Sequence, residues 1–209
     1  MDTAENTPLR AVALVCTLTP SPAPSSSQLL AEQTMASLAE HGVTGEIVRI
    51  VDHDVRAGVR IDMGDGDAWP GIREKIMDAD ILVLATPIWL GHPSSVAQRV
   101  LERLDAELSE TDDEGRMLTY GKVAAVCVVG NEDGAHKVSA DLFQGLNDVG
   151  FTLAPNAVSY WVGEAMQGTD YQDLDKTPDA TRSTTRTLAV NTVHLARRLK
   201  AAPYPPSEG

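Results

Sequence analysis

Five short apolar runs, separated by segments long enough to hold a helix, constrain the fold of this chain more than any other feature. The runs are AVALVC (11–16), GEIVRIV (45–51), ILVLAT (81–86), KVAAVCVVG (122–130) and NAVSYWV (156–162). Their apolar residues are continuous rather than alternating, which is typical of parallel strands covered on both faces. The runs therefore predict five parallel strands in one sheet.

The segments between the runs carry the signals of helices. Serines that can cap a helix precede the first of them, and Gly42 follows it where a glycine commonly ends a helix. Apolar residues at helical spacing mark the others. The predicted helices cover 25–42, 69–80, 94–108, 136–150 and roughly 180–201. Alternation of strands and helices predicts an α/β fold, a doubly wound parallel sheet with helices on both faces.

The length and composition suit one domain spanning 1–209. With 209 residues, 43% of them hydrophobic and 22% charged, the chain is typical of a globular protein with a sizeable core. We expect flexible ends at 1–9 and 202–209.

A net charge of −13 argues against a nucleic-acid partner, which would need clustered Lys and Arg, and against an anionic membrane surface. No apolar run is long enough to cross a membrane. Acidic residues occupy the start of the chain where a signal peptide would carry positive charge, so we expect a cytoplasmic protein.

Neither a metal site nor a disulfide is expected. If the strand order is 2-1-3-4-5, the third strand separates the strands of Cys16 and Cys127, and two strand spacings of about 4.8 Å exceed the limit of about 7 Å for a disulfide. Free thiols follow. The chain has no CxxC motif, and the acidic stretch 62–69 lacks calcium-loop spacing, which predicts a solvated, mobile loop.

In this strand order, ligands bind at the carboxyl ends of the strands near the switch point between strands 1 and 3. The first loop there, 16–30, lacks the GxGxxG and GxxxxGK[ST] motifs but is rich in hydroxyls and enters a helix. A helix N-terminus with hydroxyls can hold a phosphate without Lys or Arg. A capped helix after a rigid proline loop is the structural alternative. The candidate contacts are Thr17, Thr19, Ser25, Ser26 and Ser27, with Ser21 as a further possibility.

The second loop, in ATPIWLGHPSS (85–95), places a Trp among turn-forming residues. Pro87 and Gly91 shape the backbone, and Trp89 adds an apolar plane beside exposed N–H and C=O groups. A flat heteroaromatic ligand needs that pairing; a Trp that covers the core or a subunit contact is the alternative. The candidates are Thr86, Pro87, Ile88, Trp89, Leu90 and Gly91.

The third loop, GNEDGAHKV (130–138), offers Gly130, Asn131, Gly134 and His136. Its two acidic residues would repel a phosphate, so it should face the uncharged end of a ligand. A phosphate after strand 1 and a planar group between the other two loops outline flavin mononucleotide (FMN).

These loops resemble those of the flavodoxin-like superfamily, in its NADPH-dependent FMN reductase and NAD(P)H:quinone oxidoreductase branch, over residues 10–165. The family's pattern T-P-x-Y/W-x-G-x-P/x-S is matched at Thr86, Pro87, Trp89, Gly91 and Ser94. The first loop departs from the family, since Thr17 and Leu18 replace its usual Gly-Ser start.

The resemblance implies a flavodoxin-like sheet of order 2-1-3-4-5, bound FMN, NADPH or NADH as electron donor, and a homodimer. It implies transfer of electrons through FMN to a small molecule: a quinone, a nitro or azo compound, or a flavin. The flavin carries this chemistry, so no catalytic side chain is expected.

Two other functions stay open. One is a flavodoxin-type electron carrier, although the third loop lacks the aromatic that carriers place against the flavin. The other is an acidic interaction protein with an empty site. The segment 163–174 is either a substrate lid or part of a dimer contact.

Overall fold

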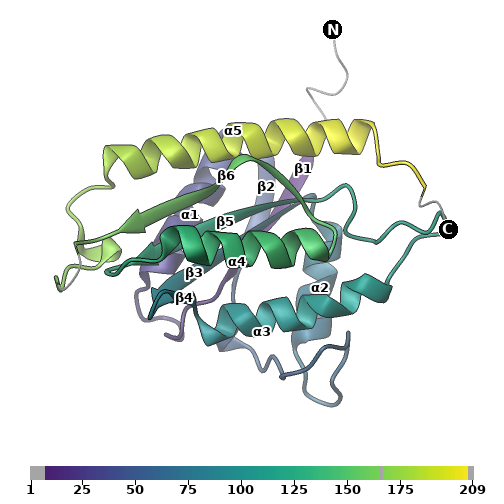
Figure 1. Cartoon of the computed structure of the whole chain (residues 1–209), viewed down its shortest axis with the longest axis horizontal. Helices are drawn as coiled ribbons and strands as arrows, with labels where there is room; N and C mark the ends of the chain where they lie inside the picture. Colours follow the sequence, from purple (N-terminus) through teal and green to yellow (C-terminus); the bar gives the residue numbers. More distant parts are fainter. Residues whose placement is uncertain (1–7, 165–166, 207–209) are drawn as a thin grey trace, which may run out of the picture.

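The computed structural model describes residues 8–164 and 167–206, and its centre is a parallel sheet (Figure 1). The strands are β1 (Leu9–Val15), β2 (Val43–Arg49), β3 (Ile81–Trp89), β4 (His92–Pro93), β5 (Val123–Gly130) and β6 (Thr152–Val162). The parallel order is β2-β1-β3-β5-β6, and β4 is a two-residue strand antiparallel to β3. The predicted order 2-1-3-4-5 is therefore confirmed, with β4 as an addition.

The five predicted helices are also present. They are α1 (Ser26–Ala39), α2 (Trp69–Asp78), α3 (Ser95–Leu104), α4 (Ala135–Asp148) and α5 (Asp179–Ala201). Short 3-10 helices within the described residues accompany them: η2 (Ile50–Asp52), η3 (Asp105–Ser109) and η4 (Tyr171–Asp173).

Helices cover both faces of the sheet, as the continuous apolar strands require. Along β1, Val12 and Leu14 face the layer of α2, α3 and α4, whereas Ala13 and Val15 face α1 and α5. Successive strand residues point to opposite faces, so the central strands need apolar residues on both faces. Figure 1 shows α5 along one side of the sheet and α2 and α3 along the other.

Where the structure describes them, the ends of the chain contact the rest of the fold. Leu9 is buried as the first residue of β1. Tyr204 bonds through its hydroxyl to Thr152 at 3.0 Å, and its carbonyl accepts from Arg116 at 2.9 Å. The rest of the predicted flexible ends, 1–7 and 207–209, lies outside the described residues.

Both cysteines are free and buried, as predicted. Burial raises the pKa of the Cys16 thiol far above its usual range, and burial raises that of Cys127 to about 12 despite a hydrogen bond with Thr34. Because the thiolate is the reactive form, neither thiol is a nucleophile at neutral pH.

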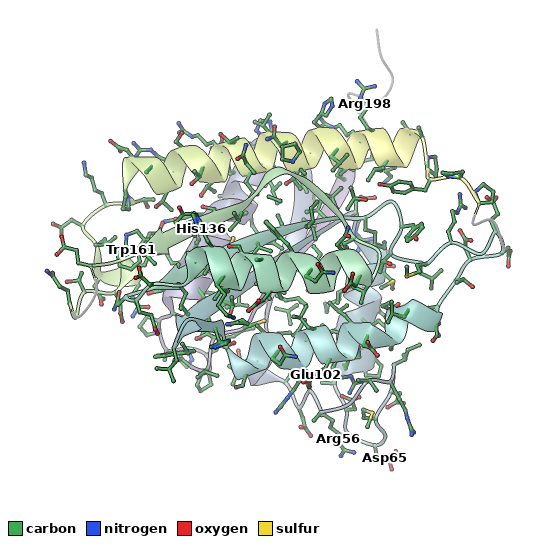
Figure 2. All side chains as sticks on the ribbon, viewed as in Figure 1. Arg56, Asp65, Glu102, His136, Trp161 and Arg198 are labelled. Carbon is green, nitrogen blue, oxygen red and sulfur yellow. The ribbon has the colours of Figure 1, made fainter. Side chains whose placement is uncertain are left out.

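The acidic stretch 62–69 differs from the predicted solvated loop. The side chain of its Asp67 is fully buried and pairs at 2.8 Å with that of Arg103 in α3, which is also fully buried. Arg103 also donates to the carbonyls of Arg56, Arg60 and Ile61. Residues 53–68, here named the Arg103 loop, thus wrap around a protein cation; Figure 2 labels Arg56 and Asp65 on it. The described residues contain no cluster of side chains suited to a metal ion.

Candidate functional site

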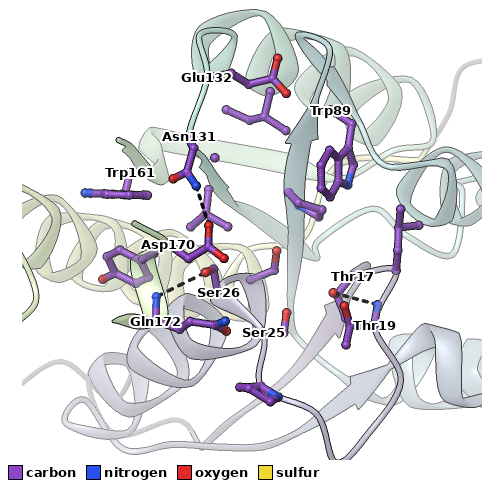
Figure 3. Close-up of a pocket in the computed structure, with 18 of the residues that line it drawn as sticks. Thr17, Thr19, Ser25, Ser26, Trp89, Asn131, Glu132, Trp161, Asp170 and Gln172 are labelled. Carbon is purple, nitrogen blue, oxygen red and sulfur yellow. Dashed lines mark hydrogen bonds between the residues drawn. The ribbon is translucent and has the colours of Figure 1, made fainter. Parts of the chain in front are cut away.

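A cavity of about 530 Å³ lies where the carboxyl ends of β1, β3, β5 and β6 meet (Figure 3). Its volume falls in the range of about 300–1,000 Å³ that is usual for small-molecule sites. The three predicted loops converge on it, together with the end of β6 and residues 167–172. The predicted residues that line it are Thr17, Thr19, Ser25, Ser26, Ser27, Pro87, Ile88, Trp89, Gly130 and Asn131.

Hydroxyls at one end of the cavity are arranged as donors. The oxygens of Thr17, Ser25 and Ser26 each accept a backbone N–H, from Thr19 at 3.2 Å, Gln28 at 3.4 Å and Gln172 at 3.3 Å, respectively. Since each oxygen accepts a bond from the backbone, its O–H hydrogen can be donated to a ligand.

The N-terminus of α1 lies at this same end, because Ser25 caps the helix. The first N–H groups of a helix lack partners inside the helix, and the helix dipole favours an anion there. No Lys or Arg is among the described residues that line the cavity. The arrangement suits a phosphate held by uncharged donors.

The first loop is held in place from outside the cavity by the end of β2. Arg49 donates to the carbonyl of Ala23 at 2.8 Å and to that of Thr19 at 3.4 Å. Asp52 accepts the N–H of Ser21 at 2.8 Å, and hydrogen bonding from Ser21 lowers the pKa of this carboxyl group. Ser21 therefore braces the loop and does not line the cavity.

Trp89 ends β3 rather than standing in a loop, and it pairs with His92 of β4. The two residues between them, Leu90 and Gly91, have φ values of 52° and 72°, as in a tight hairpin turn with both central residues left-handed. The Trp89 side chain is 54% exposed, which rules out the alternative that it covers the core.

Glu132 ties the third loop to this turn. Its carboxylate accepts the N–H groups of Leu90 at 2.9 Å and Gly91 at 3.2 Å, so these two donors face Glu132 and not the cavity. A side chain at Gly134 would place its Cβ 2.8 Å from the Cα of Gly91, so the close approach of the loops requires glycine there.

Five predicted contacts lie outside the lining: Thr86, Leu90, Gly91, Gly134 and His136. Thr86 is buried and accepts the N–H of Ser94, whose hydroxyl donates to the Cys16 carbonyl at 2.6 Å. His136 is exposed and contacts the Tyr160 hydroxyl at 3.2 Å. Thr86 thus joins β1, β3 and α3, and His136 contacts β6 from the first turn of α4.

The wall formed by the end of β6 and by η4 was not predicted from the sequence. Trp161 packs against Tyr171 with ring centroids 5.4 Å apart, and Asn131 donates to Asp170 at 2.5 Å. In Figure 3, Trp161 and Trp89 lie on opposite sides of the cavity. Trp161 stands at the carboxyl end of the fifth predicted strand, so the rule that selected the three loops could have selected it as well. Other unpredicted lining residues are Leu18, Pro24, Val129, Glu132, Gln167, Gly168 and Gln172.

The chemistry of the cavity fits FMN. One end offers hydroxyl and helix N–H donors for a phosphate, and tryptophans flank the other for a planar ring system. The amide oxygens of Asn131 and Gln172 are buried without a hydrogen-bond partner in the protein. These two acceptors on the cavity wall could bond to donor groups of a ligand.

Comparison with known proteins agrees with this geometry. Residues 10–166 match the model of the NADPH-dependent FMN reductase family. The chain belongs to this family. Membership confirms an FMN-dependent oxidoreductase with a nicotinamide nucleotide as electron donor.

Two proteins are similar to this chain over more of its length than the family model matches. The chain is 36% identical to the 8-demethyl-8-aminoriboflavin-5'-phosphate synthase of Streptomyces davaonensis, covering 94% of this chain and 80% of that protein. It is 38% identical to the divalent metal cation transporter MntH of Mycobacterium bovis, over 92% of this chain and 29% of that protein. The chain thus spans less than a third of the transporter.

Solved structures show the same fold. RosB, with its bound intermediate 8-demethyl-8-formylriboflavin-5'-phosphate, superposes with a TM-score of 0.85 at 36% identity, over 94% of this chain and 82% of RosB. An NADH:FMN oxidoreductase, EMOB, superposes with a TM-score of 0.65 at 19% identity, over 95% of this chain and 94% of its own. In this member of the FMN reductase family, no helix among the described residues has the length and apolar character to span a bilayer.

Proposed function

We propose that the cavity binds FMN and that the protein passes electrons from NADPH or NADH through it to a small planar acceptor: a quinone, a nitro or azo compound, or a flavin. The observation that carries this proposal is the joining, in one cavity, of a donor-lined helix N-terminus to a region flanked by two tryptophans.

The roles of the residues follow from their chemistry. Thr17, Ser25 and Ser26 donate hydroxyl hydrogens to the phosphate, and the start of α1 adds its N–H groups. Trp89 and Trp161 flank the ring system and exclude water from it. When bound, FMN would supply the hydride and electron-transfer chemistry, so the protein has only to bind and orient the reactants.

The mouth of the cavity selects the acceptor. Leu18, Trp89 and Leu90 are 47%, 54% and 89% exposed, and they come from the first loop and the β3–β4 turn. This apolar rim favours uncharged planar molecules over charged ones, because burying a charge there would cost free energy.

The test combines binding with turnover. The purified protein is titrated with FMN, with flavin fluorescence as the readout, and oxidation of NADPH and NADH is then followed at 340 nm. We expect tight FMN binding and steady turnover with at least one quinone or nitro acceptor. Tight binding without any turnover would favour the electron carrier, and absence of FMN binding would overturn the proposal.

A second candidate is chemical modification of the flavin itself. It is favoured by the 36% identity, over 94% of the chain, with a synthase whose named product is an 8-amino flavin phosphate. In that case FMN would be a substrate. Mass spectrometry of the flavin recovered after turnover separates the two functions, since a reductase returns FMN of unchanged mass.

We also propose a homodimer in the cytoplasm. The exposed apolar rim at the cavity supports association, and two unpaired buried cysteines are typical of a reducing compartment. Sedimentation velocity at several protein concentrations tests the dimer; a monomer at all of them would contradict it.

A further inference from the structure

Glu132 places a charged group on the wall of the cavity, and the backbone holds it there. Its side chain is partly buried, and both oxygens of its carboxylate accept hydrogen bonds from the β3–β4 turn. The donors are the N–H of Leu90 at 2.9 Å and that of Gly91 at 3.2 Å. The carboxylate is therefore fixed against the turn that follows Trp89.

No cation neutralises this carboxylate within the described part of the chain. Its partners are the two backbone N–H groups, and it forms no ion pair there. Lys137, the nearest Lys or Arg along the sequence, pairs with Asp141 at 2.6 Å. Since the described lining of the cavity contains no Lys or Arg, no charged side chain of the lining compensates the negative charge of Glu132.

The charge lies at the end of the cavity opposite the hydroxyl groups. Figure 3 shows Glu132 beyond Asn131, at the opposite end from Ser25 and Ser26 at the start of α1. In the proposed binding of FMN, the phosphate lies with the hydroxyls, so the ring system faces the third loop. Glu132 is thus at the end of the cavity that receives the part of FMN whose charge changes in the reaction.

Reduction changes the charge of the flavin ring system. A hydride from NADPH or NADH carries two electrons and one proton, so the neutral oxidised ring becomes an anion while the nicotinamide ring becomes a cation. Like charges repel more strongly in a cavity than in water, because the surroundings are less polar. A fixed carboxylate at the ring end therefore weakens the binding of reduced FMN more than that of oxidised FMN.

We propose that Glu132 determines which redox state of the flavin the cavity prefers, because its charge favours oxidised FMN over reduced FMN. By linkage, this preference lowers the midpoint potential of bound FMN below that of free FMN. The bound flavin is then the stronger reductant toward a quinone or nitro acceptor. This inference rests on the proposed binding of FMN in this cavity.

The test is Glu132→Gln, which removes the charge and nearly keeps the shape of the side chain. The dissociation constant for oxidised FMN is measured by flavin fluorescence, and the midpoint potential of bound FMN by anaerobic equilibration with a reference dye. We expect reduced FMN to bind about tenfold more tightly in the variant, which raises the potential by about 30 mV for a two-electron couple. The constant for oxidised FMN should stay nearly unchanged.

Two variants serve as controls. Asp133→Asn removes the same charge one residue along, at an exposed position outside the cavity lining. Glu132→Asp keeps the charge and shortens the side chain that holds the turn. Both should leave the potential close to that of the unaltered protein at physiological ionic strength, at which exposed charges are screened.

The opposite outcomes overturn the proposal. If Glu132→Gln changes the binding of oxidised and reduced FMN by the same factor, the potential does not move and Glu132 acts through the turn or on the phosphate. A shift as large in Asp133→Asn would assign the effect to the net charge of the protein, and a shift as large in Glu132→Asp would assign it to the turn.

The unaltered protein decides if Glu132→Gln does not fold, as judged by circular dichroism. A midpoint potential of bound FMN below that of free FMN in the same buffer supports the inference, whereas a potential at or above it contradicts the inference. Failure of the unaltered protein to bind FMN contradicts the proposed function itself.

Discussion

The Arg103 loop and the first loop of the cavity are both polar in sequence, the former acidic and the latter rich in hydroxyls. They differ in the partners of their hydrogen bonds. In the Arg103 loop, the buried Asp67 carboxylate accepts from Arg103 and from the backbone N–H groups of Arg56, Met63 and Trp69. In the cavity, Thr17, Ser25 and Ser26 accept from the backbone and keep their own hydrogens to donate. The Arg103 loop is closed on an ion pair inside the fold, whereas the hydroxyls of the first loop line a cavity that is large enough for a ligand.

The largest effect should come from breaking the closed loop. Arg103→Leu leaves the Asp67 carboxylate buried without its counter-charge, so we expect the free energy of unfolding to fall by about 3–5 kcal/mol. Urea denaturation measures this. The double variant Arg103→Leu, Asp67→Leu removes both charges and should recover part of the loss. The exposed pair Arg182–Asp179 is the control, where Arg182→Ala should cost less than about 1 kcal/mol.

Acid should weaken the same loop. Burial alone would raise the pKa of Asp67, but the bonds from Met63, Trp69, Arg56 and Arg103 outweigh it and lower the pKa. A carboxyl group with a lowered pKa stabilises the fold fully above its unfolded value of about 3.9, and the stabilisation is lost as the pH falls through the folded value. Unfolding free energies measured from pH 7 downward should therefore fall less steeply in Asp67→Asn. An equal slope in both proteins would assign the acid sensitivity to other carboxyl groups.

In the cavity, the matching test is to remove a side chain that the fold does not need. Trp89 is 54% exposed, so Trp89→Ala should leave the unfolding free energy nearly unchanged and weaken FMN binding about tenfold through lost ring contact. Trp69 is fully buried and provides the contrast, since Trp69→Ala should destabilise the fold by about 3–5 kcal/mol. Unfolding of the Trp89→Ala protein would return Trp89 to a structural role.

Much of the fold and part of the site could be predicted from the sequence, because apolar runs and helix caps are local signals. The strands, the helices and the three loops that follow strands could be predicted from such signals. The strand order, and with it the free thiols, rested on the resemblance to a family. The pairing of Asp67 with Arg103 could not be predicted, since the two residues are 36 positions apart and the run DMGDGDAW has the composition of a solvated loop. Trp161 was missed for another reason: it was counted as a strand residue, although it stands where β6 reaches the cavity.

The hairpin turn differs from the rest of the cavity because Glu132, and not a ligand, takes its N–H groups. Leu90 there has a φ of 52°, a conformation that is unfavourable for leucine and tolerated by asparagine, and it is 89% exposed. Leu90→Asn should therefore raise the unfolding free energy by up to about 1 kcal/mol, as measured by urea denaturation. If the apolar rim selects the acceptor, the same variant raises the KM for a quinone and leaves the FMN dissociation constant unchanged. A gain in stability with an unaltered KM would show that Leu90 takes no part in acceptor binding and would confine the apolar rim to Leu18 and Trp89.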